Sequence, residues 1–253
     1  MIPNPIRKVL STMAARQVRA LLMGGQACVF YGAAEFSRDV DLAVLAEAEN
    51  LALLERALAD LKAEIVFVPP LALEYLQRGH AIHFRCHHPE AMNLRVDVMA
   101  KMRGVAPFSE LWQRRTTVED RRGGVYELLA LSDLVHAKKT QREKDWPMIR
   151  RLLEADYAAA GEAAVEPRLS FWLRELRTPE LLIDAAARRP DLCARLKAQR
   201  PLLDLALAGE PQALAAALEA EEKQERERDR IYWQPLKAEL QKLRHARLQN
   251  PPG

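Results

Sequence analysis

Two glycines and two aspartates in the first fifth of the chain have the residue types and spacing of a phosphate and metal site. Gly24 and Gly25 end the apolar run 20–23, where the backbone must turn sharply. Amides at the start of the helix that follows can bind an anion. Asp39 and Asp41 are two positions apart, so in a strand they share one face while their neighbours point into the core. This arrangement suits a divalent metal ion.

A third carboxylate lies on a later predicted strand, 93–99. Alternation places Arg95 and Asp97 on one face of this strand, and Val96 and Val98 on the other. An acidic side chain among apolar neighbours is costly to bury unless a metal, a cation or hydrogen bonds compensate. Taken alone, Asp97 is equally compatible with a solvent-facing residue. Together with the glycine pair and the two earlier aspartates, it favours a metal-binding site.

The elements that must position these residues differ on the two sides of residue 125. The expected elements, in chain order, are a helix over 6–20, a short helix over 26–31 closed by Gly32, a strand over 40–45, a helix over 48–61, a strand over 64–68, a short helix ending at Gly79, and antiparallel neighbouring strands over 81–86 and 93–99. Helices follow almost throughout, and Pro235 is expected to break or kink the last of them. The sequence thus predicts an α/β (α+β) domain with a short mixed sheet over 1–124, an all-helical domain over 125–249, and a disordered tail over 250–253.

Composition narrows the class of protein. The 253 residues include 38 basic and 35 acidic side chains, and the formal charge of +3 is too balanced to favour nonspecific nucleic-acid binding. Cys28, Cys86 and Cys193 are far apart and odd in number, which favours reduced thiols in a cytoplasmic protein. No apolar run approaches the roughly 18 residues that span a bilayer, and the N-terminal segment does not have the pattern of a signal peptide. We therefore expect no membrane contact.

The combined motif resembles the nucleotidyltransferase superfamily that includes DNA polymerase β, in particular its small bacterial stand-alone and toxin–antitoxin members. Those proteins carry Gly-Gly or Gly-Ser at the start of a short helix, Asp-x-Asp on a strand, and a third Asp on a later strand. The matching residues here are Gly24 with Gly25, Asp39 with Asp41, and Asp97. The resemblance implies a nucleotidyltransferase fold and transfer of a nucleoside monophosphate from an NTP to an acceptor hydroxyl. The acceptor is a small molecule, a protein or an RNA.

The resemblance also implies roles for individual residues. Asp39 and Asp41 bridge two Mg²⁺ ions, for which Mn²⁺ can substitute, and Asp97 holds the ion that activates the acceptor hydroxyl. Asp97 is also a candidate acceptor of the hydroxyl proton. The glycine pair and Gln26 cradle the phosphates. The further candidate nucleotide ligands are Ser37, Arg38, Arg85, Lys138 and Lys139.

A basic segment follows at residues 136–145. If it is helical, Val135, Lys138, Lys139 and Arg142 occupy neighbouring positions, so that an apolar flank packs while the cations face a cleft. The segment resembles the helix after the catalytic core of small nucleotidyltransferases, where a lysine reaches the triphosphate. Lys139 is the preferred phosphate ligand and Lys138 the second choice. A solvated basic helix is the alternative.

Two departures from the family pattern keep a second class of function open. Gly25 and then Gln26 stand where many relatives have Ser directly after the first Gly, so a phosphate-contacting hydroxyl is missing and Ser37 is a partial substitute. Glu35 stands where related small proteins often carry Arg, and Arg38 is the nearby cation. The alternative function is therefore a catalytically weak, nucleotidyltransferase-like binding module, such as a toxin or antitoxin component.

A group of histidines with one cysteine raises a competing zinc hypothesis. Its members are His80, His83, Cys86, His87 and His88. Zinc favours imidazole and thiolate ligands, but this spacing lacks a paired knuckle, and in a strand His83 and Cys86 face opposite sides. We favour His83 and Arg85 on the sheet face of Asp97, where Arg85 contacts a phosphate or the acceptor, or else forms a surface salt bridge.

Overall fold

The computed structural model describes residues 3–120 and 122–249, so the tail predicted over 250–253 lies outside the described residues. The chain divides into two compact units. The first comprises Met1–Phe30, Ala34–Ala137 and Tyr232–Gly253, and the second comprises Tyr31–Ala33 and Lys138–Ile231. The main division therefore falls between residues 137 and 138, not at the predicted 124/125, and the C-terminal segment returns to the first unit.

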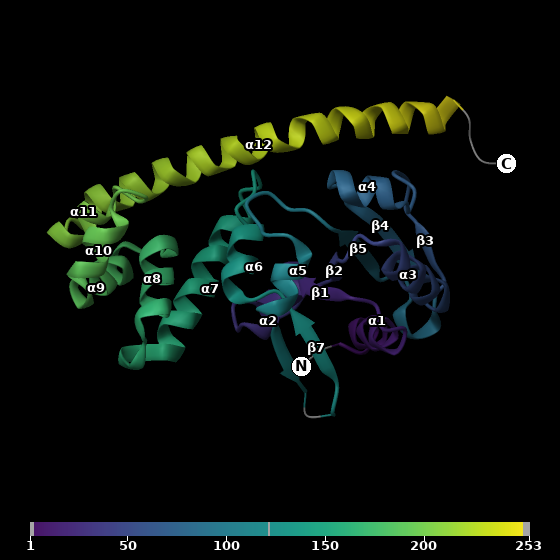
Figure 1. Cartoon of the computed structure of the whole chain (residues 1–253), viewed down its shortest axis with the longest axis horizontal. Coiled ribbons are helices and arrows are strands. Elements are labelled where there is room, and N and C mark those ends of the chain that lie inside the picture. Colours follow the sequence, from purple (N-terminus) through teal and green to yellow (C-terminus); the bar gives the residue numbers. More distant parts are fainter. Residues whose placement is uncertain (1–2, 121, 250–253) are drawn as a thin grey trace. The chain divides into compact units, whose positions relative to one another are not determined.

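The first unit contains one mixed sheet. Among the described residues it has seven strands in the order β3-β4-β5-β2-β1-β7-β6 (Figure 1). The strands are β1 (Ala20–Met23), β2 (Asp39–Val44), β3 (Ala63–Ile65), β4 (Ile82–Cys86), β5 (Arg95–Met99), β6 (Thr116–Glu119) and β7 (Val125–Leu128). β2 pairs in parallel with β5 and antiparallel with β1, and β4 pairs antiparallel with β5. The predicted mixed α/β class and the antiparallel pairing of β4 with β5 are confirmed.

Helices precede, connect and follow these strands. They are α1 (Asn4–Ala15), α2 (Gly24–Phe30), α3 (Ala48–Asp60), α4 (Leu73–Arg78), α5 (Phe108–Gln113), α6 (Leu131–Ala137) and the single 3₁₀ turn η1 (Pro89–Ala91). In α3, Leu54, Ala57 and Leu58 recur at helical spacing and are buried, which explains why this segment is a helix packed on the core. Gly79 ends α4 with a φ of +102°, a conformation that favours glycine.

Two boundaries predicted from the sequence are wrong, one before β1 and one in the β6–β7 hairpin. The helix predicted over 6–20 ends at Ala15, and β1 begins at Ala20. A four-residue buried strand has no alternation that would separate it from a helix. The boundary predicted after residue 124 falls inside the β6–β7 hairpin, in which Thr116 pairs with Leu128. β7 was therefore wrongly assigned to a helical domain.

The second unit is helical in its described part. It contains α7 (Asp145–Ala160), the 3₁₀ turn η2 (Gly161–Ala163), α8 (Glu166–Glu175), α9 (Pro179–Arg188), α10 (Pro190–Leu196), α11 (Leu203–Ala208) and the first part of α12 (Pro211–Gln249). Trp172, Leu173, Leu176 and Leu182 are fully buried, as expected for helices packed around an apolar centre.

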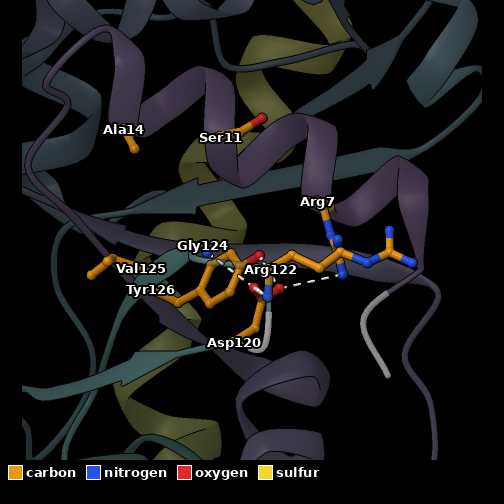
Figure 2. A pocket seen from close by; sticks show the side chains of 8 residues that line it. All are labelled: Arg7, Ser11, Ala14, Asp120, Arg122, Gly124, Val125 and Tyr126. Atoms are coloured by element: carbon orange, nitrogen blue, oxygen red, sulfur yellow. Dashed lines mark hydrogen bonds and ion pairs between the residues drawn. The ribbon is translucent and has the colours of Figure 1, made fainter.

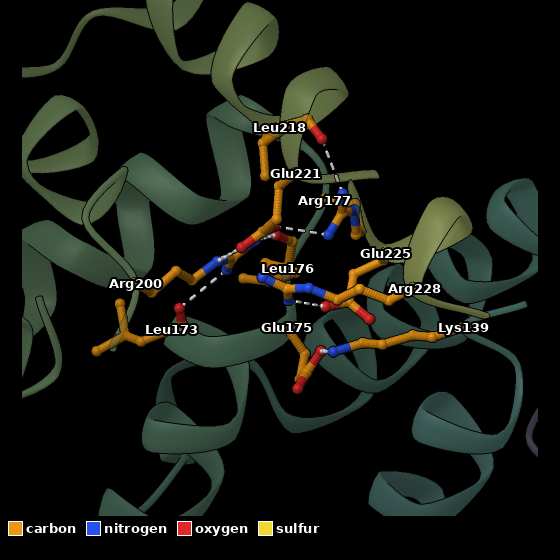
Figure 3. A network of polar contacts seen from close by, with 10 residues as sticks. All are labelled: Lys139, Leu173, Glu175, Leu176, Arg177, Arg200, Leu218, Glu221, Glu225 and Arg228. Carbon is orange, nitrogen blue, oxygen red and sulfur yellow. Dashed lines mark hydrogen bonds and ion pairs between the residues drawn. The ribbon is translucent and has the colours of Figure 1, made fainter. Parts of the chain in front are cut away.

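A buried polar network also connects the helices of the second unit (Figure 3). Arg177 and Arg200 are nearly buried, and both donate hydrogen bonds to the carboxylate of Glu221. Arg200 also donates to the carbonyl oxygens of Leu173 and Leu176. Burial is the main cause that lowers the pKa of Arg177, with the neighbouring Arg200 acting in the same direction and Glu221 opposing it. Glu221 thus compensates two buried cations.

The last helix, α12, continues through Pro235, so a break there is wrong, and the alternative of a kink stays a prediction. The part of α12 that follows Pro235 makes polar contacts within the first unit. Glu239 lies 2.8 Å from His80 Nε2 and 3.1 Å from Arg78. Arg247 donates a hydrogen bond to the carbonyl oxygen of Phe67 at 2.8 Å. These contacts oppose the cost of proline in a helix interior. In the described part of the chain, no helix has both the length and the apolar character needed to cross a membrane.

All three cysteines are buried and none forms a disulfide. Burial raises the pKa of Cys86 to about 11, and burial together with nearby carboxylates raises that of Cys193 to about 11. We therefore expect no thiol of the native protein to react with a thiol-specific reagent at pH 8, and all three to react in denaturant. Mass-spectrometric counting of labelled thiols checks this expectation. Fast labelling of Cys86 in the folded protein would contradict it.

Candidate functional site

The three aspartates of the predicted metal site lie on one face of the sheet. In the parallel pair of β2 and β5, Asp41 is the register partner of Asp97, and Asp39 is the partner of Arg95. The residues that alternate with the aspartates, including Val40 and Val96, are fully buried. The predicted alternation on both strands is therefore confirmed. Neighbouring strands lie about 4.8 Å apart, so Asp41 and Asp97 are immediate neighbours across the strands.

The glycine pair lies directly against this face, at the point where β1 ends and α2 begins. Gly24 has a φ of +67°, and a Cβ atom built there would lie 1.8 Å from Oδ2 of Asp41. A Cβ atom at Gly25 would lie 2.8 Å from Oγ of Ser37. No side chain fits at either position without displacement of these neighbours. Glycine is therefore required for the backbone to approach Asp41 so closely.

The loop before β2 contributes Ser37 and Arg38. The Ser37 hydroxyl lies 3.0 Å from Oδ1 of Asp39 and 3.1 Å from the carbonyl oxygen of Asp39, so it orients the first carboxylate of the motif. Arg38 is exposed, with its guanidinium 5.9 Å from the centre of the Phe36 ring. Glu35 is also exposed.

Asp97 is held by two nitrogen-bearing side chains. Arg95 Nε donates to Oδ1 of Asp97 at 2.7 Å, and His83 Nδ1 lies 2.9 Å from the same oxygen. The side chain of Asp97 is 16% exposed. Burial alone raises the pKa of Asp97, but the hydrogen bonds from His83 and Arg95 outweigh it and hold the pKa below its usual value. Asp97 is therefore a stable carboxylate and a weak base.

The neighbouring strand β4 adds His83 and Arg85 to the same face. His83 is the register partner of Asp97, and Arg85 is the partner of Arg95. The predicted placement of both on the face of Asp97 is thus confirmed. The exposed Arg85 donates to the carbonyl oxygen of Asn93 at 3.1 Å. Arg95 is the residue whose importance the sequence did not reveal, although its position two residues before Asp97 was visible.

Gln26, in the first turn of α2, is fully buried, and neither its amide nitrogen nor its amide oxygen has a hydrogen-bond partner within the described residues. Each such buried group costs about 1–3 kcal/mol when left unsatisfied. No local pattern predicts that this glutamine is buried. Two unsatisfied amide atoms beside the glycine turn are typical of a position kept for a ligand, a water or another polar group.

The expected helical spacing of the basic segment is wrong, because α6 ends at Ala137. Lys138 lies 3.8 Å from Asp145, and Lys139 lies 2.6 Å from Glu175. Both ion pairs lie within the second unit. They favour a structural role for the two lysines, and their role as phosphate ligands stays a prediction.

The zinc hypothesis finds no support in the geometry. Cys86 lies on the buried side of β4 and His83 on the other, His80 pairs with Glu239, and the ring of His88 accepts a hydrogen bond from the backbone N–H of Glu90. Among residues 3–120 and 122–249, no group of three or more His, Cys, Asp or Glu side chains is arranged to hold a metal ion. The three aspartates thus share a face without forming a closed cage.

A hollow of about 270 Å³ lies elsewhere in the first unit, between α1 and the β6–β7 hairpin (Figure 2). Asp120 is its central polar group. Asp120 accepts hydrogen bonds from the hydroxyl of Tyr126 and the backbone of Gly124, and lies 3.3 Å from Arg7. Backbone hydrogen bonds are the main cause that lowers the pKa of Asp120. These contacts explain how the hairpin turn is held.

These residues define a class of site: a sheet face with three carboxylates, a histidine and two arginines, next to a glycine turn. No known family model matches the chain, and no curated protein matches it either. Function is therefore inferred from the residues and geometry of this face.

Replacement of Gly24 by alanine tests the close approach to Asp41. We expect Gly24→Ala to lower the free energy of unfolding by about 1–3 kcal/mol more than Gly104→Ala, because its Cβ overlaps Asp41. Gly104 is the matched control: its φ is +70° and a Cβ there meets nothing within 4 Å. Urea unfolding of both variants measures the difference. Equal destabilisation would show that the turn does not press on Asp41.

Proposed function

We propose that the chain is a Mg²⁺-dependent nucleotidyltransferase that moves a nucleoside monophosphate from an NTP to an acceptor hydroxyl on a small molecule, a protein or an RNA. The observation that carries the proposal is the in-register pairing of Asp41 with Asp97, with Asp39 two positions away on the same face. The resemblance of the glycine and aspartate motifs to the nucleotidyltransferase superfamily supports it. The mixed α/β class of the first unit agrees with the nucleotidyltransferase fold that we propose for it.

The donor set fits the metal that the resemblance implies. Mg²⁺ prefers carboxylate oxygens and completes its coordination with water and substrate phosphates. Three carboxylates on one face need cations to relieve their mutual repulsion. Asp39 and Asp41 would hold the ions, and Asp97 would be a further ligand of one of them. Bound divalent ions would neutralise charge on the triphosphate and on the attacking oxygen.

The chain's own residues would assist the transfer step by orienting the reacting groups. The acceptor oxygen forms a bond to the α-phosphorus, the bond from that phosphorus to the bridging oxygen breaks, and pyrophosphate leaves with the electron pair. The hydroxyl proton passes to water or to the carboxylate of Asp97, whose lowered pKa makes it a weaker base than an ordinary aspartate. Ser37 orients Asp39, and the backbone of Gly24 and Gly25 gives the phosphates access to the face.

The proposal is tested by incubating the purified full chain with Mg²⁺ or Mn²⁺, each α-labelled NTP, and total RNA or cell extract. We expect label on an acceptor with the wild type and none with Asp39→Asn or Asp41→Asn. Label transferred equally by these variants would exclude the proposed site. Thermal shift with each NTP is the companion measurement, and a shift without transfer would indicate a missing acceptor.

One observation favours the alternative, a catalytically weak binding module such as a toxin or antitoxin component. Asp97 is already compensated by Arg95 and His83, so the face is stable as a charge network. In this alternative the face recognises a partner through its alternating charges and performs no transfer. The absence of both label transfer and an NTP-dependent thermal shift, with every NTP tested, would favour this alternative.

A further inference from the structure

Arg95 is placed to neutralise Asp97, the carboxylate of β5. Its Nε donates to Oδ1 of Asp97 at 2.7 Å, and its register partner on β2 is Asp39. The hydrogen bond to Asp97 is the main cause that raises the pKa of Arg95, and the charges of Asp39 and Asp41 contribute in the same direction. The Arg95 guanidinium is therefore the direct counter-charge of Asp97, on a strand whose neighbour carries Asp39 and Asp41.

A divalent ion and this guanidinium cannot both interact fully with Asp97. Oδ1 of Asp97 accepts a hydrogen bond from Nε of Arg95 and lies 2.9 Å from Nδ1 of His83, so this oxygen has little room for a metal. An ion on either oxygen would also lie within about 5 Å of the guanidinium, where like charges repel strongly. Metal binding at Asp97 therefore requires Arg95 to move away or proceeds against its charge.

We propose that Arg95 is an internal counter-ion that holds Asp97 while the face carries no metal and competes with divalent cations for that carboxylate. The proposal rests on the proposed function only in taking the three aspartates as metal ligands. The side chain of Arg95 is 45% exposed, so solvent is open to it when it leaves Asp97. Once displaced, the guanidinium stands next to the face as a cation for an anionic substrate group.

Arg85 provides a matched control. It lies on the same sheet face, directly opposite Arg95 in the pairing of β4 with β5, and it is exposed. Its guanidinium donates a hydrogen bond to the carbonyl oxygen of Asn93, which is a neutral acceptor. Removing either arginine changes the net charge of the face equally. Only removal of Arg95 takes a permanent cation from Asp97, which keeps its contact with His83.

The experiment titrates Mn²⁺ into the full chain and measures free Mn²⁺ by electron paramagnetic resonance. We expect Arg95→Gln to lower the Kd for Mn²⁺ by about tenfold or more, because a cation next to the ligand is removed. Arg85→Gln should stay within about threefold of the wild type, since a more distant, exposed charge is screened. Arg95→Lys keeps the charge and should also stay close to the wild type.

The double variant Arg95→Gln/Asp97→Asn tests whether Arg95 acts through Asp97. In this variant the increase in Mn²⁺ affinity expected for Arg95→Gln should disappear. An unchanged or raised Kd in Arg95→Gln, an equal gain in Arg85→Gln, or a gain that survives in the double variant would each overturn the proposal. So would absence of Mn²⁺ binding in every variant. Circular dichroism confirms that each variant is folded.

These outcomes are separate from those of the transfer assay. Mn²⁺ affinities that follow the expected order in a chain with neither label transfer nor an NTP-dependent thermal shift would support the role of Arg95 and reject nucleotidyl transfer. Label transfer by a wild type whose Mn²⁺ affinity does not respond to Arg95→Gln would do the reverse.

Discussion

Asp39→Asn and Asp41→Asn are each expected to lower the rate of label transfer by at least about a thousandfold, equivalent to about 4 kcal/mol of transition-state stabilisation. The amide keeps the size of the side chain and removes the charge that holds a divalent ion. Both carboxylates lie on the partly exposed side of β2, opposite the core, so the fold should be retained. Initial rates at saturating Mg²⁺ and NTP measure the effect.

Glu64→Gln is the matched control for these variants. Glu64, on β3, is the register partner of Arg85 and lies on the same sheet face, but β4 and β5 separate it from β2, and it is exposed. Glu64→Gln removes the same charge and should change the rate by less than about threefold, because exposed charges separated by more than about 10 Å are largely screened. An equal loss in Glu64→Gln would mean that transfer depends on the general field of the face and not on metal ligation.

Glu221→Gln is expected to destabilise the second unit by about 3 kcal/mol, the largest effect on stability that we predict. The variant leaves Arg177 and Arg200, with side chains 6% and 5% exposed, without the carboxylate that compensates both (Figure 3). Two guanidiniums of like charge then share a desolvated site. The carbonyl oxygens around Arg200 satisfy hydrogen bonds but not charge.

Urea unfolding followed by tryptophan fluorescence measures this loss, since Trp146 lies against the guanidinium of Arg177. Glu219→Gln is its control. Glu219 pairs with Lys223, both side chains are largely exposed, and such a pair contributes less than about 1 kcal/mol. A loss for Glu221→Gln no larger than for Glu219→Gln would show that the two arginines are compensated without Glu221.

The parts of the site that alternate along strands could be predicted from the sequence. Asp41 and Asp97 each sit between buried apolar residues, Asp39 precedes one, and a period of two fixes their face without knowledge of the strand order. The antiparallel pairing of β4 with β5 was also predictable, because a short polar turn separates them. The parallel pairing of β2 with β5, which brings Asp41 next to Asp97, was not, because 50 residues of chain lie between these strands.

Other features depend on tertiary contacts that no local pattern encodes. Lys138 and Lys139 follow a helix that stops at Ala137, and their carboxylate partners come from other elements. The counter-charge from Arg95 depends on the rotamer that reaches Asp97 and on the pairing with Asp39. The passage of α12 through Pro235 is accompanied by contacts of Glu239 with Arg78 and His80.

The most direct test of the metal and nucleotide site is a crystal structure of the full chain with Mn²⁺ and an NTP analogue that resists cleavage at the α-phosphate. We predict anomalous Mn²⁺ density bound by Asp39 and Asp41, triphosphate oxygens on the same ion, and Arg95 moved away from Asp97. Mn²⁺ or triphosphate bound away from this face, or a face with the Arg95–Asp97 contact intact and no Mn²⁺ at saturating concentration, would contradict the account.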